Sequence, residues 1–316
     1  MDYSQFMIMH HEIGLLIVFL LVFLFDTFLP KNAQSKLSVT ACVLFGAYTL
    51  YGFFAPMTFG SAFAGMYETT PIVASIKNIL NVGMFIVLLQ SIKWNNSESQ
   101  IVRRGEFIEL MLLTLFGMYL MVSARHFLLF IIGLETASLP LAALVAFDKK
   151  QYESHEAAVK YIFTAVFSSA IYMMGLSFVY GLTGSLYFND IAGRVLAYEN
   201  SALLIVALAF VISGIGFKIS LVPFHLWTAD VYQGAPTSVT SYLSVISKGA
   251  ATFAALVILT QVFGTVYSQV WEWMLYALII LTITIGNLFA IRQNNMKRFL
   301  AFSSISQAGY IMLGVI

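Results

Sequence analysis

The sequence predicts an all-α protein that crosses a membrane many times, and two observations lead to this fold class. Of the 316 residues, 60% are hydrophobic and only 10% are charged, whereas a soluble domain is about half apolar and about a quarter charged. Stretches without any charge also recur, among them 37–67, 161–189 and 249–271. About 20 apolar residues cross a bilayer as a helix. Because the stretches are continuous rather than alternating, they predict helices and exclude a membrane β-barrel.

Short polar segments, such as KWNNSESQIVRRGE and DKKQYES, join the apolar stretches, and none is long enough to form a separate soluble domain. The pattern predicts ten helices in order along the chain. We expect them at 11–29, 37–55, 71–91, 106–123, 126–147, 155–182, 201–226, 236–263, 272–291 and 296–316.

Basic residues are distributed unevenly between the two sets of loops. The loops that follow the odd-numbered helices hold ten of them, namely Lys31, Lys36, Lys93, Arg103, Arg104, Lys149, Lys150, Arg292, Lys297 and Arg298. The opposite loops hold only Arg125 and Arg194. Because basic loops stay in the cytoplasm, we expect a multi-pass protein of the bacterial cytoplasmic membrane with its N-terminus outside.

Several other classes of protein have no support in the sequence. The net charge of +1 gives no basic field for binding a nucleic acid. The single cysteine, Cys42, excludes a disulfide framework and a cysteine metal site. The N-terminus lacks the basic region of a cleaved signal peptide, so we expect the first span to remain. No phosphate-binding loop, HExxH motif or Ser-His-Asp pattern points to soluble enzyme chemistry.

Glu135 lies midway along the fifth predicted helix, within FLLFIIGLETASLPLAALVAF. A carboxylate at the centre of a bilayer costs at least a few kcal/mol. We therefore expect it to face the other helices and either to bind a proton or to pair with a cation. A structural salt bridge is the alternative explanation.

Lys218 follows a charge-free run from Asn200 to Phe217, so it is predicted to lie deep in the seventh helix. Pro223 comes five residues later and leaves the carbonyl of Ile219 without its helical partner. The helix is therefore expected to break beside the lysine, as membrane helices do where they line a polar cavity or an ion path. Alternatively, Lys218 only pairs with Glu135.

Two further lysines fall within predicted spans. Lys160 lies four residues after Glu156, so an ordinary ion pair on one helix face, or a side chain that reaches the interface, competes with a proton-transfer role. Lys248 lies inside the eighth helix after serines that could hold water or could simply allow close packing: Ser241, Ser244 and Ser247.

His225 stands in PFHLW near the end of the seventh helix, where it could relay protons at neutral pH. A hydrogen-bonded core histidine is an equally good interpretation. Asp26 and Lys77 lie near the ends of spans and are expected at the membrane interface rather than in a site.

Two segments resemble a known family. GFKISLVPFHLWTADVYQGAPTSVTSYLSVISKGA (216–250) and GNLFAIRQNNMKRFLAFSSISQAGYIMLG (286–314) are similar to segments of the subunit N family of proton-translocating NADH-quinone oxidoreductases, the respiratory complexes I. GLETASLPLAALVAF and EAAVKYIFTAVFSSAIYMMGLSFVYGLTGSLYF resemble the fifth and sixth helices of that family. The resemblance covers residues 106–316.

The resemblance implies fourteen helices, which include two inverted five-helix repeats. Residues 1–105 would be a three-helix N-terminal segment, 106–263 the first repeat and 264–316 the start of the second. Because the sequence stops after the tenth predicted helix, we expect a longer subunit or a split one that another chain completes. The resemblance also assigns proton transfer to Glu135, Lys160, Lys218 and Lys248, and makes His225 a link toward the second half.

In function, the resemblance implies a proton-translocating subunit without redox chemistry or cofactors of its own. NADH, FMN, iron–sulfur clusters and quinone would belong to partner subunits. The partners would be other membrane subunits of complex I, including neighbouring antiporter-like subunits, within the lipid bilayer. Two alternatives remain, namely a subunit of a multi-subunit cation/proton antiporter and a structural membrane scaffold that pumps nothing.

Overall fold

The computed structural model describes residues 4–28, 36–55, 58–97, 103–198, 201–264 and 268–316, and Lys31 of the basic loops lies outside them. Helices dominate, and two short strands form the one sheet in this part of the chain. The elements are α1 (Ser4–Ile8), α2 (His10–Phe28), α3 (Leu37–Phe54), β1 (Gly60–Ala62), β2 (Tyr67–Thr69), α4 (Pro71–Asn95), α5 (Arg104–Ser123), α6 (Phe127–Val145), α7 (Tyr152–Thr183), α8 (Phe188–Val195), η3 (Leu196–Tyr198), α9 (Ala202–Ile219), α10 (Leu226–Gly234), α11 (Thr237–Tyr242), η4 (Leu243–Ser247), α12 (Lys248–Val257), η5 (Ile258–Val262), α13 (Ser268–Ile291) and α14 (Met296–Leu313).

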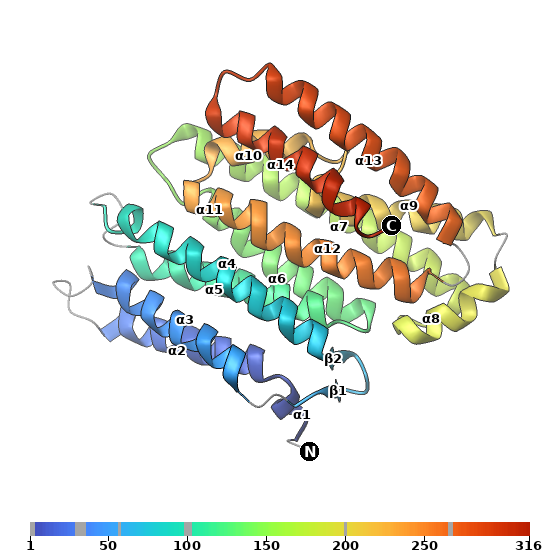
Figure 1. Cartoon of the computed structure of the whole chain (residues 1–316), viewed down its shortest axis with the longest axis horizontal. Coiled ribbons are helices and arrows are strands. Elements are labelled where there is room, and N and C mark those ends of the chain that lie inside the picture. Colours follow the sequence, from blue (N-terminus) through green and yellow to red (C-terminus); the bar gives the residue numbers. More distant parts are fainter. Residues whose placement is uncertain (1–3, 29–35, 56–57, 98–102, 199–200, 265–267) are drawn as a thin grey trace.

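The ten predicted helices are all present, and nine helical segments of the described residues are long and apolar enough to cross a membrane. The predicted helix 296–316 forms as α14 but is not among these nine. The helices run side by side, with α2 and α3 at one edge and α13 at the other (Figure 1). The short helices α1 and α8 and the antiparallel β1–β2 hairpin were not predicted from the sequence.

Side chains at the helix ends explain where several helices begin. Thr70 accepts a hydrogen bond from the Val73 N–H at the start of α4, and Pro71 follows it at the first helical position. His126 Nδ1 accepts a hydrogen bond from the Leu128 N–H, 3.0 Å away, at the start of α6. Each cap satisfies a backbone donor that would otherwise have no partner in the first turn.

Helices α5 and α6 approach so closely that no side chain fits between them at two points. A Cβ atom on Gly117 would lie 2.5 Å from the backbone nitrogen of Ala137. A Cβ atom on Gly133 would lie 2.7 Å from the backbone nitrogen of Met121. Small residues of this kind allow membrane helices to pack backbone against backbone. The two glycines therefore fix the separation of α5 and α6.

The predicted break in the seventh helix is confirmed. Helix α9 ends at Ile219, Ser220 has a left-handed backbone with φ of 70°, and α10 begins only at Leu226. The peptide bond between Val222 and Pro223 is cis. Other groups bind the backbone freed by the break, since the Val222 N–H donates to Thr282 Oγ1 on α13 at 2.9 Å. The predicted helix 201–226 is thus interrupted: α9 and α10 are separate helices, and a turn whose backbone is hydrogen-bonded to α13 joins them.

The eighth predicted helix is continuous but not uniform. It consists of α11, the wide turn η4, α12 and the wide turn η5. Both wide turns are π-helical, and Lys248 follows the first of them directly. Because π turns reorient the residues next to them, they occur often at functional sites. Helix α12 lies in the interior, where it contacts α4, α5 and α14.

Candidate functional site

Lys218 lies in the last turn of α9, directly beside the break, and its side chain is only 4% exposed. The ammonium donates to Ser138 Oγ on α6 at 2.8 Å and to the Tyr161 hydroxyl on α7 at 3.4 Å. Ser138 in turn donates to the Leu134 carbonyl at 2.7 Å. Neutral hydroxyls of two other helices therefore hold the ammonium. The burial of Lys218 agrees with the deep position predicted from the sequence.

A cavity of about 10 Å³ adjoins Lys218. Three serines are among its lining residues, namely Ser138, Ser168 and Ser169. A single buried water needs roughly 10–15 Å³ of such space and two to four polar partners. The cavity is therefore close to the size that one water requires, next to an ammonium that could exchange a proton with it.

Glu135 lies one turn before Ser138 on α6, and its side chain is half-buried rather than enclosed. The expectation that it faces the other helices stays a prediction. No ion pair within 4 Å joins Glu135 to Lys218 among the residues that the structure describes. A simple structural salt bridge between Glu135 and Lys218, the alternative weighed above, is therefore not what this structure contains.

Lys248 is 2% exposed, and its ammonium reaches α14. It donates to the carbonyl oxygen of Ser304 at 2.9 Å and to Oγ of the same serine at 2.8 Å. It also lies 5.8 Å from the centroid of the Tyr232 ring. Ser241 and Ser244 donate to carbonyls of their own helix, and neither of the two explanations offered for them is tested by these bonds.

A row of aromatic side chains connects the surroundings of the two lysines. The ring centroids of Tyr161 and Trp227 are 5.3 Å apart, and those of Trp227 and Tyr232 are 6.3 Å apart. Tyr161 contacts Lys218, and Tyr232 lies beside Lys248. The Tyr232 hydroxyl is buried without a hydrogen-bond partner in the described chain. Buried polar groups of this kind usually bind water.

Lys160 does not join this buried set. Its ammonium pairs with Glu156 at 2.7 Å on its own helix and with Asp230 at 2.6 Å on α10, and its side chain is 42% exposed. Asp230 also accepts from Arg298 of α14 at 2.6 Å. The ion pair with Glu156 is the one that the spacing predicted. Sequence reasoning missed Asp230 and Arg298, although a carboxylate just after the broken helix was a visible signal.

His225 is buried in the turn between α9 and α10. Its Nδ1 atom makes no hydrogen bond within the described residues, and its carbonyl accepts from the Thr228 N–H at 2.9 Å. The ring is therefore not held as a fully hydrogen-bonded core histidine. Its proposed role as a link stays a prediction.

Lys77 was expected at the membrane interface rather than in a site, and the structure encloses it in protein. Lys77 is fully buried, and its ammonium pairs with Glu12 of α2 at 2.6 Å. The reason is local, because the β1–β2 hairpin and the first turn of α2 cover this end of α4 and supply the partners. The sequence shows that Lys77 lies near the end of an apolar stretch, but it does not show that the β1–β2 hairpin and α2 pack over that end.

Asp230 allows a direct test of how the three charged helices are held together. We expect Asp230→Asn to lower the free energy of unfolding by about 1–2 kcal/mol, because it weakens two half-exposed ion pairs that are each worth up to about 1 kcal/mol. Thermal unfolding of the purified chain in detergent measures the change. Asp190→Asn is the control, since Asp190 accepts from Ser185 at 2.9 Å and belongs to no ion pair among the described residues. Equal losses in the two variants would contradict the interpretation.

Comparison with known proteins adds a family and close relatives. Residues 124–316 match the family described as NADH:quinone oxidoreductase/Mrp antiporter, transmembrane. The chain is 51% identical to NADH-quinone oxidoreductase subunit N of Azobacteroides pseudotrichonymphae, over 100% of this chain and 65% of the relative. It is 52% identical to the subunit of the same name from Phocaeicola vulgatus, over 100% of this chain and 66% of the relative. The chain thus spans just under two thirds of the length of these relatives.

Among solved structures, a chain of respiratory complex I from Thermus thermophilus with bound aureothin is similar. The TM-score is 0.76 at 30% identity, over 96% of this chain and 64% of that chain. The helical architecture described above is therefore shared with an experimentally determined membrane complex.

Proposed function

This chain belongs to the NADH:quinone oxidoreductase/Mrp antiporter transmembrane family, and on that basis we propose that it is a proton-translocating membrane subunit of an NADH-quinone oxidoreductase. Its task would be to move protons across the membrane through Lys218, Lys248 and the groups around them. The relatives named subunit N support this assignment over other members of the family. Oxidation of NADH and reduction of quinone would take place in partner subunits.

One observation carries the proposal. Two buried lysines, Lys218 and Lys248, are held by hydroxyl and carbonyl oxygens rather than by carboxylates. When a lysine in a buried ion pair loses its proton, its carboxylate partner is left as an unpaired buried charge, which is costly. Lysines held by neutral oxygens avoid this cost. Ionisable residues inside a membrane domain most often mark such ion or proton pathways.

The transfer would run along the row of aromatic residues that joins the two lysines. Lys218 would give its proton to water beside Ser138 and Tyr161, and Lys248 would receive one near the unpartnered Tyr232 hydroxyl. The half-buried charge of Glu135 favours the protonated form of Lys218 when it is ionised and nearby. His225 would extend the path from the turn beside Lys218.

Lys160 would act at the edge of this path. Its ammonium is bound to Asp230 and Glu156 in the present arrangement rather than to Glu135. If Lys160 moved toward Glu135, the field at Lys218 would change, because a cation would then offset the carboxylate. In the proposed path, Lys160 is a charge that changes position and does not itself carry the proton.

The surroundings proposed for the chain follow from the same assignment. It would sit in the bacterial cytoplasmic membrane beside other antiporter-like subunits, with its basic loops in the cytoplasm and its N-terminus outside. It would bind no cofactor itself. We further propose that 1–105 form an N-terminal helical unit, that 106–263 form the first five-helix repeat and that 264–316 begin a second one.

The proposal is tested by Lys248→Met in the assembled, full-length complex. We expect NADH-driven proton uptake by inverted membrane vesicles to fall about tenfold, which equals about 1.4 kcal/mol of barrier. The exposed lysine of α4 offers a control, Lys93→Met. Unchanged uptake in the Lys248 variant would reject the pumping role. Sodium-dependent transport without any NADH-linked activity would instead favour an antiporter subunit, which the family description also covers.

A further inference from the structure

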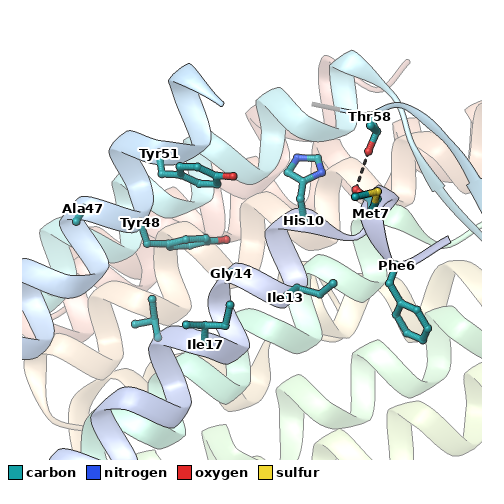
Figure 2. Close-up of a pocket in the computed structure, with 11 residues that line it drawn as sticks. Phe6, Met7, His10, Ile13, Gly14, Ile17, Ala47, Tyr48, Tyr51 and Thr58 are labelled. Atoms are coloured by element: carbon teal, nitrogen blue, oxygen red, sulfur yellow. Dashed lines mark hydrogen bonds between the residues drawn. The ribbon is translucent and has the colours of Figure 1, made fainter. Parts of the chain in front are cut away.

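A pocket of about 610 Å³ opens between α2 and α3, far in sequence from the lysines discussed above. Its walls are mostly apolar, but His10, Tyr48, Tyr51 and Thr58 also line it. Figure 2 shows the two tyrosine hydroxyls directed to the side of the pocket where His10 lies. His10 is the first residue of α2, so the pocket reaches the end of a membrane helix, where water is available.

The ring of His10 is hydrogen-bonded to that of His11, and the partners fix which nitrogen carries a proton. Asn78 donates its amide N–H to the Gly52 carbonyl at 2.9 Å, so its Oδ1 accepts from His11 Nε2 at 3.0 Å. A neutral His11 then has a bare Nδ1, which accepts from His10 Nε2 at 2.8 Å. His10 Nδ1 is left as the one free acceptor of the pair.

The surroundings of His10 Nδ1 would allow it to bind a proton. His10 Nδ1 is buried and makes no hydrogen bond within the described residues. His10 lies in the first turn of α2, just after Met7 and Ile8 of α1, and all three residues lie at one end of these helices. The second ring would share the charge through the bond between the two histidines.

A buried ion pair lies next to the two histidines along the chain and through the Tyr119 ring. Glu12, the next residue, pairs with Lys77 at 2.6 Å and accepts from the Tyr67 hydroxyl at 2.8 Å. Lys77 also donates to the Tyr67 hydroxyl at 3.0 Å. Titratable groups of the neighbouring elements link the pair to this ion pair. The Tyr48 hydroxyl of α3 donates to the His11 carbonyl at 2.7 Å, and the Tyr119 ring of α5 lies 6.2 Å from the His11 ring. The Lys77 ammonium of α4 lies 5.6 Å from the same Tyr119 ring and contacts Glu12 of α2 and Tyr67 of β2.

Stability alone is a weak explanation for this cluster. A buried ion pair is often matched or exceeded in stability by apolar residues of the same size, because removing both charges from water costs several kcal/mol. Intramembrane charges beside an unpartnered histidine nitrogen are better explained by a site that binds an ion. Of the ring nitrogens of His10 and His11, only His10 Nδ1 lacks a partner among the described residues, and a bare imidazole nitrogen is a position that binds a proton.

We propose that His10 and His11 form a proton-binding site that exchanges one proton with the pocket, and that Glu12 and Lys77 set its affinity. The incoming proton is held at Nδ1 of His10, and the proton on His10 Nε2 can shift to Nδ1 of His11, so that the two rings share one positive charge. Release reverses these steps. The site does not depend on the function proposed above for the lysines.

Hydrogen–deuterium exchange at the imidazole C2 position, followed by mass spectrometry, tests the site in the full-length chain purified in detergent. The exchange rate follows ring protonation, so each histidine yields a titration curve when the pH is varied through the acid and neutral range. We expect His10 and His11 to titrate in one shared step. That step should move by about one pH unit to higher pH in Lys77→Gln and to lower pH in Glu12→Gln, because one variant removes a positive and the other a negative neighbour.

Exposed His155 on α7 is the internal reference, and neither substitution should move its curve. Displacement of the shared step in the same direction by both variants, or no displacement, would show that the charges only support the fold. The wild-type curves test the site even where a variant does not fold. Two independent titrations, or no titration of His10, would overturn the proposal.

Discussion

Lys218→Met is expected to reduce proton translocation about hundredfold or more, because a positioned group that transfers a proton contributes about 10²–10⁴-fold to a rate. Methionine fills the space between α6 and α7 but leaves Ser138 and Tyr161 without the ammonium that they now contact. The measurement is the initial rate of NADH-driven proton uptake by vesicles that contain the assembled complex, relative to the amount of assembled complex.

Lys218→Arg separates a carrier from a fixed charge. Arginine keeps the positive charge but cannot be deprotonated in a protein. If Lys218 carries the proton, the arginine variant should be as inactive as the methionine variant. If a permanent charge beside the break of α9 is all that is needed, arginine should restore translocation, and the carrier role would be abandoned. The exposed Lys93→Met again controls for a general effect of losing a lysine.

Gly117→Ala is expected to destabilise the protein strongly. The added Cβ would lie 2.5 Å from the Ala137 nitrogen and 2.6 Å from the Gly133 carbonyl oxygen, and backbone atoms cannot rotate away as a side chain can. We expect the loss to reach the upper end of the about 1–3 kcal/mol usual for overpacking. Cys42 is buried and is the only cysteine of the chain, so thiol labelling during heating of the purified chain reports its unfolding.

Gly181→Ala is the matched control. Gly181 also lies inside a helix, but a Cβ there would meet nothing within 4 Å. Alanine favours a helix over glycine by up to about 1 kcal/mol, so this variant should be unchanged or slightly more stable. If both alanine variants unfolded at the wild-type temperature, the close contact between α5 and α6 would not limit stability.

The fold and part of the site could be predicted because they depend on local sequence. Apolar length fixed the helices within a few residues, and Pro223 beside a charge-free run predicted the break at Lys218. The wide turns around Lys248 could not be predicted, because no proline or glycine pattern separates a π turn from an ordinary helical one. The β1–β2 hairpin was missed because its three-residue strands are too short for an alternating pattern.

Partners from distant helices were the harder part. Whether Lys160 turns to Glu135, Glu156 or Asp230 depends on how α7 and α10 pack, and spacing along one helix suggests only Glu156. The environment of Lys77 likewise required the position of Glu12, which is 65 residues away in the sequence. Sequence patterns predicted which residues are charged within the membrane region, but not which of them meet.

The two ion pairs of Asp230 couple α7 to α14. One carboxylate holds a cation from α7 with one oxygen and a cation from α14 with the other, so the two contacts share a single charge. Two ligands of the same group are thermodynamically coupled, and the coupling is reciprocal. Whatever draws Lys160 away leaves Asp230 entirely to Arg298, and a displacement of α14 changes how strongly Lys160 is retained. A movement of α7 on one side of α10 therefore changes the contact with α14 on the other side, and the reverse also holds.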